Sequence, residues 1–193
     1  MFLRKAVSDD AEAILSIYAP YIENTTITFE YDVPSVSDFK KRMKKILGTY
    51  PYFVCEEDGK VVGYAYGCRF SERAAYNWDM ELSVYIRNGF KGKGIGKALY
   101  SAVIETGKLM GIRNFCSKIT SPNTASENLH KKLGFELEGV LKKSGYKLGV
   151  WKDVLYYTKH SLSDEPPEEL IPFNKLSDKA VDEILAKYEK TIE

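Results

Sequence analysis

The 193-residue sequence has few cysteines and histidines, which limits the chemistry that it can carry. Its three cysteines, Cys55, Cys68 and Cys116, are widely spaced, and neither a CxxC pair nor a Cys/His spacing typical of zinc ligands occurs. An odd number of cysteines in apolar stretches also argues against a disulfide framework. We therefore expect no metal centre, and we interpret the three cysteines as core thiols.

The chain also lacks an excess of charge of one sign. Lys and Arg number 28 against 27 Asp and Glu, so electrostatics give no reason to expect nucleic acid or a membrane surface as a partner. No apolar run is long enough to span a bilayer, and the N-terminal stretch MFLRKAVSDD lacks the apolar core of a signal peptide. The length suits one domain with a substantial core, and we expect a soluble cytoplasmic protein.

What the sequence does contain is a strand, a glycine-rich turn and a helix in direct succession over residues 80–110. Apolar residues alternate over 82–86, as in a strand, and recur at helical spacing over 98–110; the turn between them, 91–97, reads KGKGIGK. A helix N-terminus leaves main-chain N–H groups unpaired and attracts anions, and glycine lets the main chain approach an anion closely. The stretch predicts a pyrophosphate-binding loop. The alternative is a solvated turn with glycine for tightness and lysine for solubility.

Spacing excludes two common phosphate-binding loops. A Walker A loop that ends on Gly96 and Lys97 needs Gly at Lys91 and Ser or Thr at Ala98, and the dinucleotide fingerprint G-x-G-x-x-G fails from either starting glycine. Residues 91–96 instead resemble motif A of the GNAT superfamily of acetyl-CoA-dependent N-acetyltransferases, [QR]-x-x-G-x-[GA]. Lysine keeps a cation at the first position, where the family usually has Gln or Arg.

A second stretch, NTASENLHKKLGF at residues 123–135, resembles motif B of the same superfamily, N-x-x-x-x-x-L-[YH]-x-K-x-G-F. The matching residues are Asn123, Leu129, His130, Lys132, Gly134 and Phe135. Histidine at the position of the family's usual tyrosine is the pattern of the phosphinothricin N-acetyltransferases. Residues 73–86 resemble their substrate segment and 145–154 their C-terminal signature, and TITFEY at 26–31 also fits. The likeness covers about residues 1–160.

Strand and helix patterns alternate along the rest of the chain. Besides the strand before the turn, we expect strands at 2–7, 52–55, 61–70, 114–119, 136–140 and 150–159, with a short strand or extended loop at 26–31. Asp58-Gly59 predicts a hairpin turn, and KKSGYKLG a connection between the last two strands. The alternation indicates an α/β (α+β) fold with a mixed, mostly antiparallel sheet covered by helices.

Capping and breaking residues mark the expected helix ends. These are Ser8, Asp9 and Asp10 with Pro20 to bend or end the first helix, Ser35 or Ser37 for the second, Thr124 with Glu127 as a capping box and Gly134 as its stop, and Ser177 for the last. A polar linker, residues 163–169, separates an acetyltransferase-like domain, 1–162, from that last helix. Its apolar stripe would pack on its own domain, on a partner subunit, or on nothing if the tail is frayed.

The resemblance implies the GNAT fold, whose twisted sheet splays apart at its central strands, and acetyl-CoA as cosubstrate. Main-chain N–H groups of the turn would hold the diphosphate, and the strand before it would pair with the pantetheine arm. In the family, the asparagine of motif B contacts the pantetheine or the reaction region. The cofactor-binding residues that we expect are Val84, Tyr85, Ile86, Lys91, Gly92, Lys93, Gly94, Ile95, Gly96, Lys97, Asn123 and Lys132.

Acetyl transfer requires a deprotonated amine, a polarised thioester carbonyl and a departing thiolate that is protonated or stabilised. Glu81, on the strand that enters the turn, is placed to take the amine proton if burial or a water relay assists it; it could instead be the structural partner of a cation. His130 can act as an acid, a base or a hydrogen-bond donor near neutral pH, or it can be structural.

Residues before the same strand are the candidates for the acceptor site. Arg73 suits a substrate carboxylate, because a guanidinium matches that group with two hydrogen bonds. Tyr76, Trp78 and Phe29 would wall the side-chain pocket, with plain core packing as the alternative for Trp78 and Phe29.

Three functional hypotheses follow. The first is an N-acetyltransferase of a small amino-acid-like substrate of the phosphinothricin, methionine sulfoximine or methionine sulfone type. The second keeps the reaction and changes the acceptor to a polyamine, an aminoglycoside or a peptide amine. The third is a non-catalytic acetyl-CoA-binding module. The resemblance further implies a homodimer and a role in detoxification.

Overall fold

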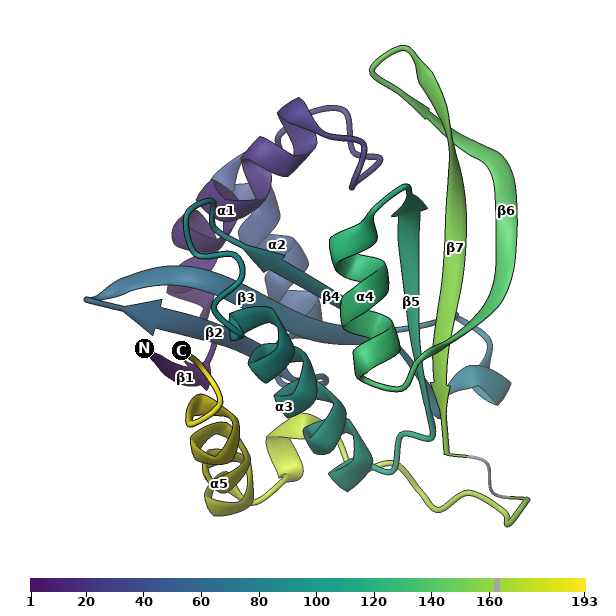
Figure 1. Cartoon of the computed structure of the whole chain (residues 1–193). Helices are drawn as coiled ribbons and strands as arrows, with labels where there is room; N and C mark the ends of the chain where they lie inside the picture. The colour runs from purple at the N-terminus through teal and green to yellow at the C-terminus, as the bar shows by residue number, and fades with distance from the viewer. Residues whose placement is uncertain (162–163) are drawn as a thin grey trace.

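The computed structural model describes residues 1–161 and 164–193. One seven-stranded sheet, in the order β1-β2-β3-β4-β5-β7-β6, carries helices on both faces (Figure 1). The strands are β1 (Phe2–Lys5), β2 (Tyr52–Glu57), β3 (Lys60–Arg69), β4 (Asp79–Ile86), β5 (Asn114–Ser121), β6 (Glu136–Lys147) and β7 (Val150–His160). The helices are α1 (Ala11–Asn24), α2 (Val36–Ile46), α3 (Ile95–Leu109), α4 (Thr124–Lys132) and α5 (Asp178–Glu189). The predicted mixed, mostly antiparallel sheet is confirmed.

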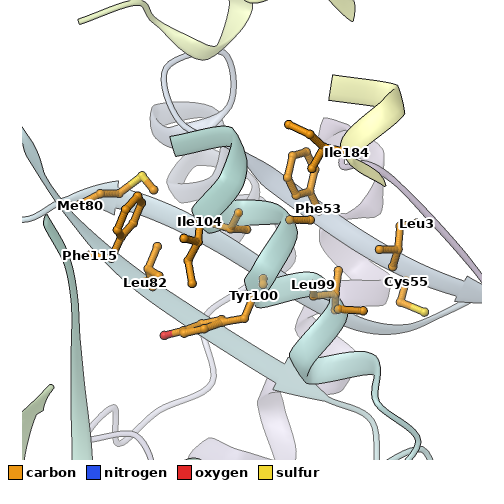
Figure 2. Packing of buried hydrophobic residues seen from close by; sticks show 14 of the residues in the cluster. Leu3, Phe53, Cys55, Met80, Leu82, Leu99, Tyr100, Ile104, Phe115 and Ile184 are labelled. Atoms are coloured by element: carbon orange, nitrogen blue, oxygen red, sulfur yellow. The ribbon is translucent and has the colours of Figure 1, made fainter. Parts of the chain in front are cut away.

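Each face of the sheet has its own hydrophobic core, because successive side chains of a strand point to opposite faces. Phe53 and Val54, neighbours in β2, are both fully buried, one in each core. Under α3 and α5, Phe53 packs in a cluster that includes Leu99 and Ile184 (Figure 2). Under α1 and α2, Val54 belongs to a cluster that includes Tyr64. Two covered faces hold the central strands rigidly in place.

The sheet opens between its two central parallel strands. The β4–β5 ladder runs only from the pair Asp79–Asn114 to the pair Glu81–Cys116, whereas β5 pairs with β7 along its whole length, from Asn114 to Ser121. Beyond Glu81 the two strands diverge, and α4 follows β5 beside the gap (Figure 1). The splayed central strands expected from the resemblance are therefore present.

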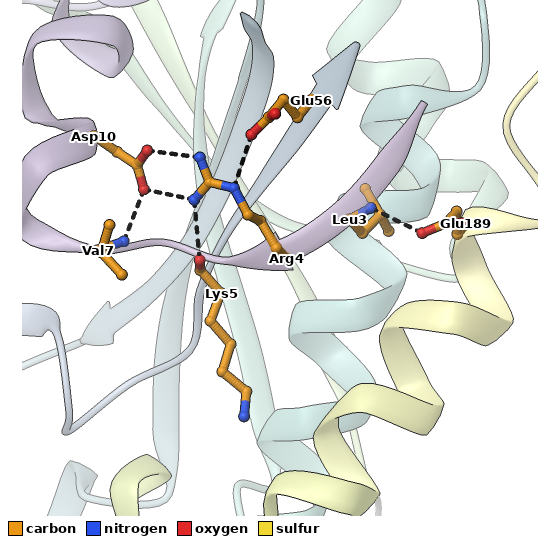
Figure 3. Close-up of polar contacts among 7 residues, drawn as sticks. All are labelled: Leu3, Arg4, Lys5, Val7, Asp10, Glu56 and Glu189. Atoms are coloured by element: carbon orange, nitrogen blue, oxygen red, sulfur yellow. Dashed lines mark hydrogen bonds and ion pairs between the residues drawn. The ribbon is translucent and has the colours of Figure 1, made fainter. Parts of the chain in front are cut away.

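Arg4 ties the first strand to the start of α1 (Figure 3). Its guanidinium donates to both carboxylate oxygens of Asp10, at 2.7 and 2.8 Å, and to Glu56 at 2.9 Å. Burial acts to raise the pKa of the Asp10 carboxyl, but the hydrogen bonds from Arg4 and from the Val7 N–H outweigh it, so the pKa is lowered. The pairing fixes the N-terminal strand and helix together.

Several helix and strand limits differ from the prediction at the N-terminal end. The first strand stops at Lys5 instead of Val7. Pro20 does not end the first helix, since α1 continues to Asn24. Tyr21 and Ile22 beyond the proline are buried, and that packing outweighs the hydrogen bond that proline cannot make. Residues 26–31 form a loop without strand pairing, and of the two proposed caps of α2 it is Ser35 whose side chain accepts the Asp38 N–H.

Two further corrections concern the second half of the chain. The cap of α4 is Asn123, whose side chain accepts the Ser126 N–H, so the predicted capping box at Thr124 is one residue late. Gly134 does end that helix, with φ +78°. The segment KKSGYKLG is mostly strand, because a bulge between Leu141 and Gly145 lets β6 continue to Lys147.

The cysteines are interior thiols, as expected. All three are free; Cys55 and Cys116 are buried and Cys68 is half-buried. Burial raises the pKa to about 11 for Cys55 and Cys116 and to about 12 for Cys68. These thiols are therefore poor nucleophiles at neutral pH.

The last helix packs on its own domain. Val181, Ile184 and Leu185 of α5 are buried in the cluster that α3 covers, and the two chain ends lie side by side (Figure 1). The predicted domain end at residue 162 and the first linker residue, 163, lie outside the described residues. None of the helices in the described part of the chain is long and apolar enough to cross a bilayer.

Candidate functional site

A cleft of about 490 Å³ occupies the gap between β4 and β5. Its walls are the end of β4, the turn that leads into α3, the second half of β5 and the inner side of α4. Of the residues expected at the cofactor, those that line it are Val84, Tyr85, Ile86, Lys91, Gly92, Gly94, Gly96, Lys97, Asn123 and Lys132. Two widely separated sequence motifs thus meet in one cavity.

The glycine-rich turn has the backbone conformation that its sequence suggests. Gly92 and Gly94 adopt φ of +86° and +82°, which side-chain-bearing residues rarely reach, and Gly94 directly precedes the first turn of α3. A Cβ at Gly92 would meet nothing within 4 Å, so the turn is open on that side. Open main-chain N–H groups at a helix start fit a phosphate group.

The side chains of the turn point in different directions. The Lys91 ammonium lies 4.8 Å from the centre of the Tyr21 ring, and that of Lys93 lies 5.0 Å from the Phe90 ring. Lys97 lines the cleft, while Ile95 is buried in the core and anchors the start of α3. Lys93 and Ile95 are thus the two expected cofactor residues that do not line the cleft.

The β4 edge that faces the cleft has no strand partner beyond Glu81 among the described residues. The Ile86 carbonyl accepts a hydrogen bond of 2.6 Å from the Tyr21 hydroxyl. The Tyr85 ring packs against Tyr18 and Tyr64 on the face of the sheet that α1 and α2 cover. With its side chain turned to that face, Tyr85 lines the cleft with its main chain. An extended polar chain can pair with such an edge as an added strand would.

Glu81 forms an ion pair with a residue that sequence reasoning missed. The Lys118 ammonium of β5 donates to the Glu81 carboxylate at 2.7 Å, across the point where the two strands separate. Burial acts to lower the pKa of Lys118, but the hydrogen bond and the charge of Glu81 outweigh it, so the pKa is raised. Lys118 lines the cleft, whereas Glu81 does not line it and is joined to it only through this ion pair. Glu81 is therefore held by a cation of the cleft wall.

His130 lies in a buried polar chain at the other wall of the cleft. Its Nδ1 is 2.7 Å from the Ser126 carbonyl, which can only accept, so Nδ1 carries the hydrogen. Its Nε2 then accepts from the Tyr100 hydroxyl at 3.1 Å, and Tyr100 accepts from Ser117 at 2.7 Å. Burial lowers the pKa of His130 in spite of the hydrogen bond to Ser126. Burial thus favours the neutral ring, and both of its nitrogens have partners.

Tyr100 and Ser117 were not identified from the sequence, although both line the cleft. Tyr100 lies on the buried face of α3, where its spacing indicates only core packing. Burial raises the pKa of its hydroxyl, which is thus a hydrogen-bonding group and not an ionised one. The sequence offers one indication of this position: Tyr100 follows Gly96 by one helical turn, so the two residues lie on the same face of α3, and both line the cleft.

The four candidate acceptor residues do not line the cleft. The Phe29 ring lies against Gly145 of β6, at a place where a larger residue has no room. Arg73 and Tyr76 are on the exposed loop before β4, and the Tyr76 ring packs edge-on against Phe70. Trp78 donates its indole N–H to the Glu168 carbonyl at 2.8 Å. The loop lies at the end of β4 that is remote from the glycine-rich turn.

Comparisons with known proteins match this arrangement. The family model described as an acetyltransferase (GNAT) domain matches residues 3–156. A phosphinothricin N-acetyltransferase of Alcaligenes faecalis is 37% identical over 79% of this chain and 79% of its own. An L-methionine sulfoximine/L-methionine sulfone acetyltransferase of Pseudomonas aeruginosa is 32% identical over 80% and 91%.

A solved structure extends the comparison to the whole fold. It is the crystal structure of a GNAT superfamily phosphinothricin acetyltransferase from Sinorhizobium meliloti in complex with AcCoA. It is 36% identical, with a TM-score of 0.83 over 90% of this chain and 96% of the other.

Proposed function

Because this chain belongs to the GNAT acetyltransferase family, we propose that it acetylates the amine of a small, amino-acid-like molecule at the expense of acetyl-CoA. The N-acetyltransferase activity and the cosubstrate follow from the family and from relatives of similar length, while the acceptor class rests on what those relatives are named for. One observation carries the proposal: a single cleft joins the glycine-rich turn, the open edge of β4 and the polar residues Lys118 and His130.

The glycine-rich turn and β4 would hold the cosubstrate. The main-chain N–H groups of Gly92 to Lys97 bind its diphosphate, with Lys91 and Lys97 adding charge, and the Val84–Ile86 edge pairs with its pantetheine arm. Asn123 and Lys132 complete the wall on the α4 side. The fit rests on the positive φ of Gly92 and Gly94 and on the unpaired strand edge. When bound, acetyl-CoA supplies an activated thioester.

Glu81 acts as the base in this proposal. The acceptor enters as an ammonium, which is not nucleophilic, and Glu81 takes its proton through a water molecule at the cleft wall. Lys118 keeps the carboxylate in one orientation by the 2.7 Å ion pair. Lys118 is the cation that the structural alternative from the sequence calls for; in this proposal it also positions the base.

His130 takes a positioning role. Its neutral ring accepts from the Tyr100 hydroxyl and so keeps Tyr100, together with Ser117, at the cleft wall. The departing sulfur is stabilised when the Tyr100 hydroxyl turns from His130 Nε2 to donate to it. This differs from a histidine that donates a proton itself, because Nδ1–H is directed at the Ser126 carbonyl. A change of the Tyr100 hydroxyl and a change of the ring should therefore affect the same step.

Arg73 is the proposed partner of the acceptor's carboxylate. Phe29, Tyr76 and Trp78 are the proposed walls of the side-chain pocket; Tyr76 and Trp78 share the segment before β4 with Arg73, whereas Phe29 lies against β6. Arg69 orders the segment before β4 by donating to the Glu72 carbonyl and to the Asn77 side chain. The loop directly precedes the strand that carries Glu81. Arg73→Ala should raise the KM for the acceptor and leave the KM for acetyl-CoA unchanged.

The direct test is an amine panel with mass detection of the product. Phosphinothricin, methionine sulfoximine, methionine sulfone, a polyamine, an aminoglycoside and a peptide are each incubated with acetyl-CoA while free thiol is followed. We expect acetylation of the amino-acid-like members and competition by free amino acids. Preference for the polyamine or aminoglycoside would transfer the proposal to that acceptor class, and cosubstrate binding without turnover on any amine would contradict it.

A cytoplasmic location and a role in detoxification stay predictions from the resemblance.

We also propose that the protein forms a homodimer through the β6–β7 hairpin. The edge strand β6 and its partner carry an unusual number of exposed large apolar side chains: Leu137, Val140, Leu141, Tyr146, Leu148, Val150 and Trp151. Soluble monomers seldom expose so many large apolar side chains on one edge hairpin, and a second copy would cover part of them. Sedimentation should give a dimer, and Leu141→Glu with Trp151→Glu should give a monomer.

A further inference from the structure

The segment after β7 runs along α3 from one end of the helix to the other. At the C-terminal end of α3, Arg113 donates to the Glu165 and Pro166 carbonyls and the Ile171 N–H donates to Met110. α5 then packs beside α3, and the chain finishes at the N-terminal end of α3 (Figure 1). This C-terminal strap, residues 164–193, lies outside the residues that match the family model.

Polar contacts fix α5 in its place on α3 and β1. The Glu105 carboxylate of α3 accepts from Lys187 at 2.7 Å and from the Tyr188 hydroxyl at 2.5 Å. On the other side, Glu189 accepts the Leu3 N–H at 3.1 Å (Figure 3). Together with the buried face of α5, these contacts give the end of the strap a fixed starting point.

The strap ends on the glycine-rich turn. The Glu193 N–H donates to the Lys93 carbonyl at 3.1 Å. The Thr191 carbonyl lies 3.0 Å from the point where a Cβ of Gly94 would be, so the tail closes that side of the turn and would crowd a larger residue there. Thr191 is itself held by hydrogen bonds from its hydroxyl and its N–H to the Tyr188 carbonyl.

One peptide plane connects this contact to the cleft. The Lys93 carbonyl and the Gly94 N–H belong to the same planar trans peptide and point in opposite directions. A carbonyl held toward Glu193 therefore directs the Gly94 N–H away from the tail. Gly94 has φ +82°, in a region of backbone conformation that glycine adopts and leaves easily. Without the hydrogen bond from Glu193, the peptide plane between Lys93 and Gly94 could therefore rotate.

We propose that the C-terminal strap is a positioning element for acetyl-CoA: by holding the Lys93 carbonyl, its last residues aim the Gly94 N–H at the diphosphate. The inference rests on the proposed role of the turn. Within the described residues 164–193, no residue of the strap lines the cleft. Glu193 and Thr191 would therefore act on cosubstrate affinity indirectly, through their contacts with the turn. The last residues of the strap, Thr191 to Glu193, contact only the diphosphate end of the cleft.

The test compares Glu193→Pro, which removes the N–H donor, with Glu193→Ala, which keeps it. The dissociation constant of CoA is measured by calorimetry, and kinetics are measured with acetyl-CoA and with S-acetylpantetheine, which has no diphosphate. Glu193→Pro should weaken CoA binding about three- to tenfold, the range for one hydrogen bond. Glu193→Ala should bind as the wild type does. The kcat at saturating acetyl-CoA, the thermal midpoint and the rate with S-acetylpantetheine should be unchanged in both.

A second variant separates a failure of this inference from a failure of the proposal that the turn binds the diphosphate. Gly92→Val strains the turn directly without touching the tail, because a Cβ at Gly92 would meet nothing within 4 Å. If it weakens CoA binding and Glu193→Pro does not, the strap has no positioning role and the turn still binds the diphosphate. If neither variant changes the affinity, both proposals are wrong. Equal loss of rate with acetyl-CoA and S-acetylpantetheine in Glu193→Pro would also overturn the inference, because the effect would then be global.

Discussion

The two ends of the cleft are built in different ways. The diphosphate end consists of main chain from one continuous stretch, residues 84–97, in which glycines set the backbone and the helix start supplies N–H groups. The reacting end is lined by side chains from three elements, Tyr100 of α3, Lys118 of β5 and His130 of α4, and Glu81 of β4 is paired with Lys118. A backbone site should depend on conformation and a side-chain site on chemical identity.

The largest expected effect lies at the reacting end. Glu81→Gln keeps the shape and removes the base, so kcat should fall by about 10²–10⁴-fold, the usual range for general base catalysis. The KM for acetyl-CoA should change little, because the diphosphate end is untouched. Steady-state kinetics with the preferred amine measure both constants. An equal loss of kcat and of CoA affinity would mean that Glu81 supports the fold and not the chemistry.

At the diphosphate end, a change of backbone conformation should matter most. Gly92→Val forces a β-branched residue into φ +86° and should weaken CoA binding roughly tenfold, as expected for about 1–2 kcal/mol of strain. Gly59→Val is the matched control, since Gly59 also has positive φ and open space but lies in the remote β2–β3 turn. Calorimetry should show weakened CoA binding only in the first. Similar loss in both would remove the distinction between the two ends.

Tyr100→Phe should reveal the buried polar chain. The substitution leaves the His130 Nε2 without a donor, and an unsatisfied buried group costs about 1–3 kcal/mol. Denaturant unfolding should show this loss of stability together with a lower kcat. CoA affinity should be unchanged. Full stability in the variant would show that the chain of hydrogen bonds carries little energy.

The pH dependence of stability should report the neutral state of His130. Its folded pKa is lowered below the ordinary value of about 6.5, so the neutral ring contributes stability above that pH. The contribution is lost as the pH falls through the lowered folded pKa, and His130→Gln should remove this part of the slope. The ring resonances of the two histidines, followed by NMR, provide a direct check. A charged His130 at pH 7 would contradict the tautomer assigned above.

The smallest effect is expected for a side chain of the turn. Lys91→Gln restores a residue common at this motif position, and CoA affinity should change by no more than about twofold, because the Lys91 ammonium packs on Tyr21 and is screened by solvent. Calorimetry at two salt concentrations measures it. A tenfold loss would mean that side-chain charge, and not main chain, dominates the diphosphate end.

The same contrast explains which parts could be predicted from the sequence. The turn and its strand and helix are consecutive, so glycine spacing and periodicity were enough to locate them. Lys118 and Ser117 come close to Glu81 and Tyr100 only because β5 lies next to β4, which periodicity does not reveal. The loop of Arg73 precedes β4 and the turn follows it, so the length of the strand, about 23 Å, separates two segments that are near in sequence. The path of the C-terminal strap likewise depends on packing.

The central claim is that main-chain N–H groups of the turn hold the diphosphate of acetyl-CoA and so direct its thioester toward Glu81. A crystal structure with bound CoA tests this most directly. The account predicts diphosphate oxygens within about 3.2 Å of main-chain nitrogens in residues 92–97 and the thiol beside Glu81, Lys118 and Tyr100. A nucleotide bound elsewhere, with the cleft between β4 and β5 vacant, would contradict it.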